Sequence, residues 1–307
     1  MYDVDIIIPA YNSINTISIP LDSLKKQKTK YKFRVVIVND NSSYSYKNIL
    51  DKYSKYMFIE EIVLDRNGGP AVARQKGIDY TDSKYIMFID SDDYLFSSDS
   101  IQKLVDNISL CNSDVAMGNF ILERDNKEEL VKNNSVWMHG KIYRRSFLED
   151  NNIRFNTSRV NEDNGFNRLV VLLTKNISHL DEVVFVYKEN DNSITRRNDR
   201  LNKFTGLEGY AYNMDWAFNE AKKRGVPQKE IEYHALSILI VSYYSYFDLK
   251  DKYDVSKILV WFKKVKDWVD INKFSNDVVN TFLESNRVNI DDVSKCDMSF
   301  YDYYNMI

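Results

Sequence analysis

The sequence predicts an α/β protein with a mostly parallel sheet flanked by helices, followed by an α-helical C-terminal module. Apolar runs that suit strands alternate with helical segments at short spacing up to about residue 122. This alternation is typical of a right-handed βαβ series. The run FRVVIV at residues 33–38 has almost no polar alternation, as expected of a strand covered on both faces of a parallel sheet. After about residue 201 the strand-like runs stop.

The first five predicted elements carry ordinary strand and helix signals. The first strand ends at Pro9, and the helix after it places Ile17, Leu21 and Leu24 on one side. The five elements are a strand at 4–8, a helix at 15–27, a strand at 33–38, a helix near 45–56 and a strand at 58–64.

Four further elements complete the series. Gly68 and Gly69 stand at the start of the first of them, and Asp99 or Ser100 supplies the N-cap of the second helix. The four elements are a helix at 69–81, a strand at 84–90, a helix at 99–110 and a strand at 113–123.

Composition and charge exclude several classes of protein. The 307 residues suggest one large domain or two ordinary ones. Apolar residues make up 44% and charged residues 28%, which is ordinary for a globular protein. The formal net charge of −3 does not call for a nucleic-acid partner.

Cysteine usage and the N-terminus point to the cytoplasm. Cys111 and Cys296 lie far apart without CxxC spacing, which argues against a zinc site and fits a reducing compartment, with a single disulfide left open. The N-terminus lacks the basic region of a signal peptide. We see no run of the roughly 18 apolar residues that a membrane span needs.

Polar residues follow each of four predicted strands. They are PAYN at 9–12, NDNSS at 39–43, DRNGG at 65–69 and DSDD at 90–93. Ligands of open α/β sheets bind beyond the carboxyl ends of the strands. We therefore expect these four segments to converge on a polar ligand.

The segment DSDD suits a divalent cation. Asp90 and Asp92 are two residues apart, so on an extended segment they point the same way while Ser91 points the opposite way. Hard oxygen donors suit Mg²⁺ or Mn²⁺, and Mg²⁺ commonly shares its shell with substrate phosphates. The alternative is a simple turn and N-cap cluster. The other polar strand ends favour the cation site.

Two interpretations are open for Gly68-Gly69-Pro70. Backbone amides there are able to approach a phosphate at a helix N-terminus. A turn followed by Pro at the first helical position explains the same residues and is favoured on this segment alone. Arg74, one turn into the helix, either reaches a nucleotide or pairs with a surface acid.

Seven motifs stand in a fixed order between about residues 3 and 197. They are IIIPAYN, VVIVNDNSS, RNGGPAVARQKGI, IMFIDSDD, HGKIYRRSFLEDNNIRF, NEDNGFNRLV and VYKENDNSITRR. Each is weak alone, but the ordered set is specific. In this order they resemble the motifs of glycosyltransferase family 2, which are nucleotide-sugar enzymes of the Rossmann-like GT-A fold.

The resemblance implies a nucleotide pocket at the strand ends. Asp40 would accept a hydrogen bond from the base, typically uracil, Arg74 would lie near the nucleotide, and Asp90 would lie by the ribose. The residues expected to bind the nucleotide sugar are Pro9, Ala10, Tyr11, Asn12, Asp40, Gly69, Arg74, Asp90 and Ser91.

The resemblance also implies the catalytic groups of an inverting, direct displacement. Asp92 would bind the metal that bridges the diphosphate, Asp163 would be the general base, and Glu162 would flank it to help place a sugar. A cation stabilises the leaving diphosphate, and the base must lie on the opposite face of the sugar. An acidic helix N-terminus explains Glu162 and Asp163 as well, and both interpretations can hold together.

Several residues depart from the family pattern. Asn39 replaces the first Asp of the usual pair, and Gly69-Pro70 stands where Leu-Ser is common. Trp137 is separated from Lys141 more widely than expected, and His139 between them is either an acceptor contact or a structural group.

The third metal ligand is unclear from the sequence. Asp191 is the expected candidate, because only Asn190, Asp191 and Asn192 stand near the closing motif. Lys188, Arg196 or Arg197 either holds the diphosphate or forms a solvated basic face.

The C-terminal module consists of amphipathic helices that the resemblance does not cover. They are expected at 206–226, 228–247 and 256–271, the first ended by Gly225. The third combines Trp261, Phe262 and Trp268 with three lysines. It either lies on an anionic membrane surface or, as we favour, packs on its neighbours.

These observations predict a metal-dependent glycosyltransferase with a catalytic domain at 1–200 and a helical module at 201–307. The expected donor is a UDP-sugar, the cofactor Mn²⁺ or Mg²⁺, and the acceptor a glycan or lipid-linked saccharide of surface polysaccharide biosynthesis. A cytoplasmic location is expected, with peripheral membrane contact and oligomerisation through the helical module left open. The alternatives are a non-catalytic nucleotide-sugar or glycan-binding protein on the same fold, or transfer to a modified nucleic-acid base.

Overall fold

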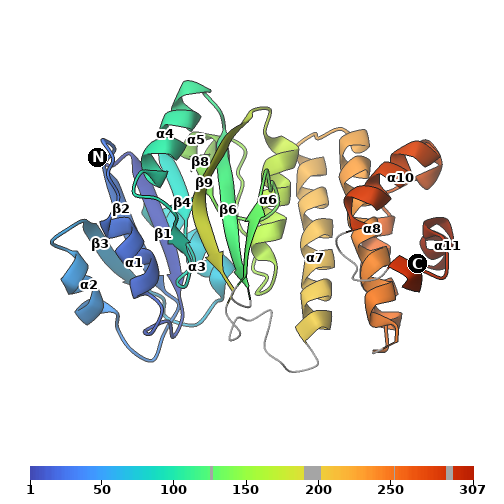
Figure 1. Cartoon of the computed structure of the whole chain (residues 1–307), viewed down its shortest axis with the longest axis horizontal. Coiled ribbons are helices and arrows are strands. Elements are labelled where there is room, and N and C mark those ends of the chain that lie inside the picture. The colour runs from blue at the N-terminus through green and yellow to red at the C-terminus, as the bar shows by residue number, and fades with distance from the viewer. Residues whose placement is uncertain (125–126, 190–201, 252, 288–292) are drawn as a thin grey trace. The chain divides into compact units, whose positions relative to one another are not determined.

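The computed structural model describes residues 1–124, 127–189, 202–251, 253–287 and 293–307, and of residues 202–205 the backbone alone. The chain divides into two compact units, residues 1–198 and 199–307 (Figure 1). A sheet with flanking helices makes up the described part of the first unit. The described part of the second unit is helical.

The sheet of the first unit has the strand order β3-β2-β1-β4-β8-β6-β9-β5, with β7 paired to β6. Its strands are β1 (Val4–Ala10), β2 (Phe33–Asn39), β3 (Phe58–Val63), β4 (Tyr85–Phe88), β5 (Tyr94–Leu95), β6 (Val115–Arg124), β7 (Lys127–Val131), β8 (Lys141–Arg144) and β9 (Ile177–Lys188). The helices of this unit are α1 (Ser18–Lys25), α2 (Lys47–Tyr53), α3 (Pro70–Tyr80), α4 (Ser100–Leu110), α5 (Arg145–Asp150) and α6 (Glu162–Leu173).

The nine elements predicted up to residue 123 are all present, and their ends lie within three residues of the predicted ones. The sheet is parallel across β3, β2, β1 and β4. Beyond β4 it is mixed, because β8 is inserted antiparallel between β4 and β6. The strand at 113–123 is therefore not the direct neighbour of β4 that an uninterrupted βαβ series would give. Ile142 and Tyr143 of β8 are fully buried, so this short strand fills the centre of the sheet.

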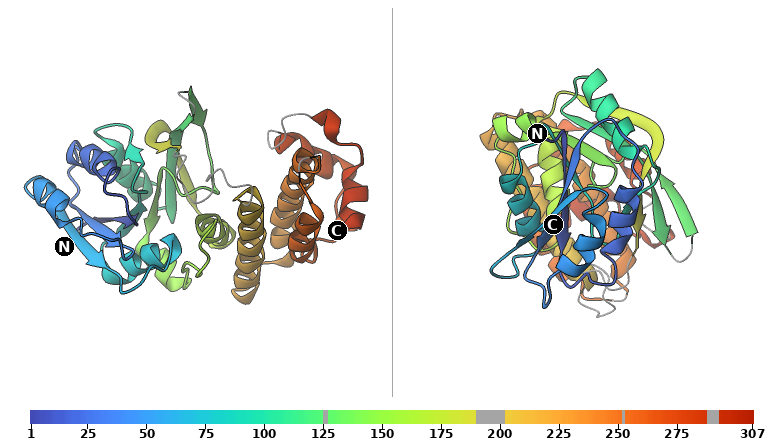
Figure 2. Two further views of the ribbon diagram at one scale, coloured as in Figure 1. Left: turned by 90° about the horizontal axis from the view of Figure 1, so that it is seen from below. Right: turned by 90° about the vertical axis from the view of Figure 1, so that its left-hand side faces the viewer.

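Helices cover both faces of the sheet (Figures 1 and 2). On one face, Ile6 and Ile8 of β1 belong to a core cluster with residues of α1, α2 and α4. On the other face, Ile7 packs against Gly77 of α3, where an added Cβ would lie 2.4 Å from the Ile7 side chain. The absence of a side chain at Gly77 thus lets α3 approach the strand closely. Burial of each such Ile or Val contributes roughly 1.5–3 kcal/mol.

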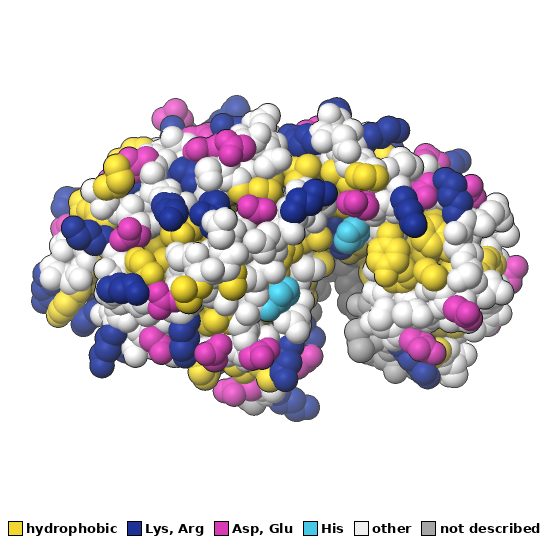
Figure 3. Space-filling model, turned by 90° about the horizontal axis from the view of Figure 1, so that it is seen from above, with side chains coloured by type: hydrophobic (Ala, Val, Ile, Leu, Met, Phe, Trp, Pro, Cys, Tyr) yellow, Lys and Arg dark blue, Asp and Glu magenta, His cyan; other side chains and the backbone are white. Residues whose placement is uncertain are grey.

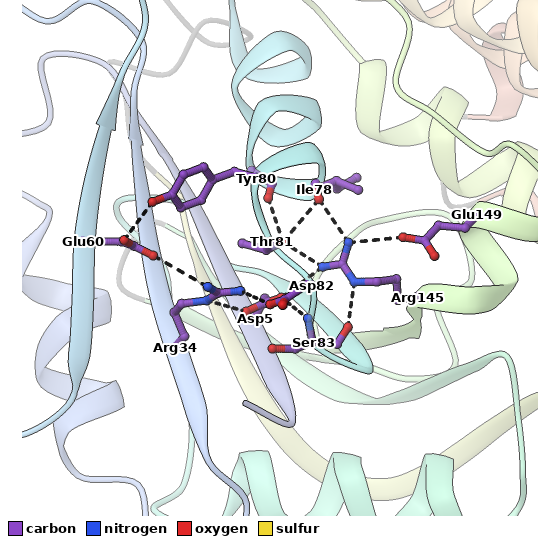
Figure 4. A network of polar contacts seen from close by, with 11 residues as sticks. Asp5, Arg34, Glu60, Ile78, Tyr80, Thr81, Asp82, Ser83, Arg145 and Glu149 are labelled. Atoms are coloured by element: carbon purple, nitrogen blue, oxygen red, sulfur yellow. Dashed lines mark hydrogen bonds and ion pairs between the residues drawn. The ribbon is translucent and has the colours of Figure 1, made fainter. Parts of the chain in front are cut away.

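A polar network closes the amino-terminal end of the parallel strands (Figure 4). Asp5 of β1 is fully buried and accepts hydrogen bonds from Arg34 at 2.8 Å, Arg145 at 3.0 Å and the Ser83 amide at 2.7 Å. Arg145 also donates to the carbonyl oxygens of Ser83 and Ile78. Burial alone would raise the pKa of Asp5, but the hydrogen bonds from Arg34 and Ser83 outweigh it and lower that pKa.

The second unit is built around α8, which is buried along most of its length. Its helices are α7 (Asn202–Lys223), α8 (Gln228–Leu249), α9 (Ser256–Lys266), α10 (Asn276–Ser285) and α11 (Phe300–Met306), with short 3₁₀ turns at Ile271–Lys273 and Val293–Lys295. Buried side chains of α8 include Ile231, Leu239 and Phe247. Gly225 adopts the left-handed conformation, φ 78°, just after α7, as expected of a helix end.

Aromatic residues in and after α9 face the interior of this unit. Phe262 is fully buried, and the indole of Trp268 donates to Asp215 of α7 at 2.8 Å. Lys263 and Lys264 are exposed. None of the described helices has the length and hydropathy of a membrane span. On the face drawn in Figure 3, acidic and basic side chains are intermixed.

Candidate active site

The carboxyl ends of β1, β2 and β4 meet through hydrogen bonds between their loops. The backbone N–H of Asn12 donates to Ser42 Oγ at 2.9 Å, and Ser43 Oγ donates to the side-chain Oδ1 of Asn12 at 3.0 Å. Ser91 Oγ donates to Ser13 Oγ at 2.8 Å. Asn12 has a positive φ of 52°, a conformation that Asn tolerates better than most residues. Loops that are far apart in the sequence thus form one polar edge.

Asp40 is held by the loop that follows β3. Its carboxylate is buried and accepts the amides of Gly68 at 2.7 Å and Gly69 at 2.8 Å. Gly69 has φ 90°, a region that favours glycine, and Pro70 begins α3. In this structure the two amides face Asp40, so the turn interpretation of Gly68-Gly69-Pro70 accounts for these residues without a phosphate.

Asn39 makes a different set of contacts from those of its neighbour Asp40. Its Nδ2 donates to Glu61 Oε1 on β3 at 2.7 Å, and its Oδ1 accepts the Ser42 amide at 2.7 Å. Glu61 also accepts a hydrogen bond from Ser45. An Asp at position 39 would place a second carboxylate against Glu61. Asn39, which replaces the first Asp of the usual pair, therefore avoids placing two carboxylates side by side.

Arg74 connects the turn after β4 to the start of α6. From α3, its guanidinium donates to Asp90 Oδ1 at 2.5 Å and to Glu162 Oε1. Its side chain is nearly fully buried, and Asp163 acts on it electrostatically as well. The structure thus brings together four of the predicted site residues, which span 90 positions from Arg74 to Asp163.

In this cluster Arg74 alone faces three carboxyl groups, and their pKa values shift in opposite directions. Burial raises the pKa of Glu162 to about 7 although Arg74 opposes the shift. Burial also raises the pKa of Asp163, and the nearby Asp90 adds to the effect. The pKa of Asp90 is lowered because Arg74 outweighs burial. Such separated values are typical of groups that accept protons in catalysis.

Helix α6 positions Asp163 in its first turn. The helix begins after Asn161, which is left-handed with φ 58°, and Glu162 and Asp163 are the acids of its first turn. Negative charge is favourable there because of the helix dipole. Further along, Asn167 accepts a 2.7 Å hydrogen bond from the fully buried Tyr143. The structural and catalytic interpretations of Glu162 and Asp163 are therefore compatible.

The turn after β4 contains the donors expected for a cation. Asp90 and Asp92 are both partly exposed, and their carboxylates are hard oxygen donors. Within the described ranges, no group of three His, Cys, Asp or Glu residues gathers to hold a metal ion. A cation bound by these two carboxylates would need phosphate oxygens and water to complete its shell, and the metal site stays a prediction.

The remaining predicted residues occupy varied positions. The Ala10 carbonyl accepts the Asp40 amide at 2.9 Å, which joins the ends of β1 and β2. Pro9 is partly buried within β1, and Tyr11 is 53% exposed. Asp191, Arg196 and Arg197 lie outside the described residues. Lys188 is described, and its backbone amide donates to Asp93 at 2.9 Å.

Sequence reasoning missed the burial of Asp93 and the contacts of the loop before β8. Asp93 is fully buried, and burial with Asp90 and Asp92 raises its pKa well above the usual value. His139 lies 3.5 Å from it and stacks on Tyr187, and burial lowers the pKa of His139 to about 4. Asp93, the third acid of DSDD, is visible in the sequence, but nothing there indicates its partners.

The comparison with known families decides the affiliation of the chain. The sequence profile described as "Glycosyl transferase family 2" matches residues 5–161, which is 157 of the 307 residues. The chain belongs to glycosyltransferase family 2. The resemblance predicted from the seven motifs is thereby confirmed.

Two curated relatives show how far this family 2 chain extends along longer proteins. "Glycosyltransferase GlyA" of Streptococcus pneumoniae is 26% identical over 226 residues, which cover 63% of this chain and 31% of the relative. The "Poly(ribitol-phosphate) beta-glucosyltransferase" of Bacillus spizizenii is 31% identical over 194 residues, 57% of this chain and 30% of the relative. The matched part is about a third of the length of these two proteins.

Solved structures share the fold of this family 2 chain. The crystal structure of Staphylococcus aureus TarS residues 1–349 in complex with UDP superposes with a TM-score of 0.67, at 20% identity, over 99% of this chain and 92% of that one. The complex with UDP-GlcNAc gives a TM-score of 0.70 over the same shares. The predicted GT-A fold with a helical C-terminal region is thus confirmed.

Proposed function

We propose that this chain is an inverting glycosyltransferase that moves a sugar from a UDP-sugar to a hydroxyl group of a glycan or glycoconjugate acceptor. One observation carries the proposal. Arg74 joins Asp90, in the turn expected to bind the donor, to Glu162, which precedes the expected base Asp163. The segments expected to bind the donor and to supply the base are therefore joined by the buried side chain of Arg74.

The reaction uses these residues in distinct roles. Asp163 accepts the proton of the acceptor hydroxyl while the acceptor oxygen bonds to the anomeric carbon and the bond to the diphosphate breaks. The raised pKa of Asp163 makes it a better proton acceptor than an ordinary carboxylate. Arg74 keeps Asp90 ionised and in place. A cation bound at Asp92 would offset the charge of the leaving diphosphate.

Relatives support the choice of donor and acceptor. TarS has been crystallised with UDP and UDP-GlcNAc, and two relatives are named for transfer to poly(ribitol-phosphate). We therefore propose a UDP-hexose or UDP-N-acetylhexosamine as donor and a surface polysaccharide or polyol-phosphate polymer as acceptor. The chain would act at the cytoplasmic face of the membrane. A more distant mannosyltransferase structure, with a TM-score of 0.56, holds GDP-mannose and Mn²⁺, so GDP-sugars and manganese belong in the test.

A screen of nucleotide sugars tests the proposal. Thermal stabilisation and hydrolysis would be measured for UDP-, GDP- and dTDP-sugars, each with MnCl₂, MgCl₂ or EDTA. We expect UDP-sugars with a divalent cation to give the largest stabilisation and slow hydrolysis. A clear preference for GDP- or dTDP-sugars would remove the uracil role from Asp40. Failure of every nucleotide sugar to bind would overturn the proposed function.

A further inference from the structure

The buried side chain of Lys141 holds the loop at residues 134–140, which lies between β7 and β8. Lys141 is 2% exposed, and its ammonium donates to the carbonyl oxygens of Asn134, at 2.7 Å, and Trp137. Burying an ammonium group is costly unless its hydrogen bonds are satisfied. Gly140 has φ 67°, and an added Cβ would lie 3.0 Å from the Gly118 carbonyl. These contacts therefore fix the backbone of the loop where it enters β8.

The same loop presents His139 to the turn that follows β4. The His139 ring stacks on Tyr187 of β9, with centroids 4.4 Å apart and planes 13° apart. Its Nδ1 lies 3.5 Å from Oδ2 of Asp93. This oxygen has no hydrogen-bond partner among the described residues. His139 is therefore fixed by aromatic packing with one ring nitrogen beside a buried carboxylate.

Asp93 also ties the turn to the end of β9. Its Oδ1 accepts the Lys188 amide at 2.9 Å. The residue after it, Tyr94, begins β5 and pairs with Val186 of β9. Asp93 thus contacts the loop at 134–140 and the last residue of β9, and it directly follows Asp92. An apolar residue would fill this site without the cost of burying a carboxylate beside two others.

We infer that Asp93 and His139 are positioning residues, which hold the turn carrying Asp90 and Asp92 in register with loop 134–140 and the end of β9 so that it can bind a nucleoside diphosphate with its cation. The inference rests on the proposed function. Neither residue need touch the donor. Lys141 supports the arrangement by fixing the loop that supplies His139.

The test compares variants that keep the packing and remove the polar contact. His139→Phe keeps a ring against Tyr187, and Asp93→Asn keeps an oxygen for the Lys188 amide. His179→Phe, at an exposed site on β9, is the matched control. The affinity for UDP is measured with MnCl₂ and with EDTA, and unfolding temperatures are recorded for each variant. If His139→Phe does not fold, Asp93→Asn carries the test.

We expect each variant to lose about tenfold or more of the manganese-dependent affinity for UDP, while affinity in EDTA and the control stay unchanged. The double variant should lose little more than either single one, because both changes break one contact. His139→Asn, which retains a side-chain amide, should recover part of the loss.

Other outcomes separate the two proposals. If wild type binds UDP and folded variants bind it equally well, or lose affinity equally with manganese and EDTA, only this inference is overturned. It is also overturned if wild-type affinity does not depend on manganese. If wild type binds no nucleoside diphosphate, the proposed function falls and this inference with it.

Discussion

Arginine and carboxylate groups gather at both ends of β1 and β4, but the ratio of arginines to buried carboxylates differs between the two ends. At the amino end, two arginines, Arg34 and Arg145, share the single buried carboxylate of Asp5 (Figure 4). The other acids that the amino-end arginines contact, Glu60, Asp82 and Glu149, are partly or largely exposed. At the carboxyl end, Arg74 alone contacts Asp90 and Glu162, with Asp163 nearby.

The two clusters differ accordingly in their acid strength. The pKa of Asp5 is lowered, whereas burial raises those of Glu162 and Asp163. A buried carboxylate whose charge is balanced by hydrogen-bond donors serves the fold. Removing one of these donors destabilises the protein, because it leaves an unpaired buried charge. A surplus of carboxylates is unfavourable unless a cation or a proton offsets it, and the proposed function expects both at the carboxyl end. The same side-chain chemistry therefore serves the fold at one end and the proposed reaction at the other.

The largest expected effect is a loss of transfer rate when the cluster at the carboxyl end of the strands is changed. Asp163→Asn should lower the transfer rate by about 10²- to 10⁴-fold, because the general base is removed. Stability should not fall, because the change relieves repulsion within the cluster. Steady-state transfer and thermal unfolding measure the two effects, with Asp181→Asn at an exposed site as control. An equally active Asp163→Asn variant would show that this residue is not the base.

The amino end should show the reverse pattern. Arg145→Met should lower the free energy of unfolding by about 3–5 kcal/mol, because it leaves Asp5 short of a buried partner. The turnover of the molecules that stay folded should be unchanged. Denaturant unfolding gives the stability, and Glu149→Gln, at the exposed partner of Arg145, should change it by no more than about 0.5 kcal/mol. A large loss of turnover in folded Arg145→Met would break the division between the two ends.

Position 39 tests whether charge balance also governs the neighbouring strand ends. Asn39→Asp should destabilise the protein by about 1–3 kcal/mol, because a hydrogen bond to Glu61 becomes a carboxylate pair. Adding Glu61→Gln should restore most of the stability. Denaturant unfolding of the two single variants and the double variant measures the coupling. Additive effects would show that Asn39 and Glu61 do not act together.

The smallest expected effect is a pH dependence of stability. The folded-state pKa of Glu162, about 7, lies above its usual 4.5, so the folded state binds more protons than the unfolded state between these values. The free energy of unfolding contributed by this group should therefore fall as pH rises from 4.5 to 7. Glu162→Gln should remove this part of the slope. Unfolding temperatures of both proteins across this range provide the measurement, and parallel curves would contradict the raised pKa.

Much of the first unit was predictable from local sequence patterns. The uninterrupted apolar run of β2 and the Gly-Pro start of α3 reflect local geometry, so the nine elements predicted up to residue 123 lie within three residues of the observed ones, whereas the short strand β5 was not predicted. The positions of Asp40 and Asp90 at strand ends follow from chain direction alone. The insertion of β8 did not follow, because strand pairing depends on which distant segment best fills the centre of the sheet.

By itself, the sequence determined the alternation of strands and helices, the family, and the residue types available at the strand ends. These are properties of neighbouring residues and of motif order. Only the tertiary structure decided that Arg74 bridges Asp90 and Glu162, that the Gly68 and Gly69 amides bind Asp40, and that His139 meets Asp93. Each of these contacts joins segments brought together by packing, and burial there sets the charges. The physical reason is that desolvation and pairing depend on three-dimensional neighbours, which spacing along the chain does not record.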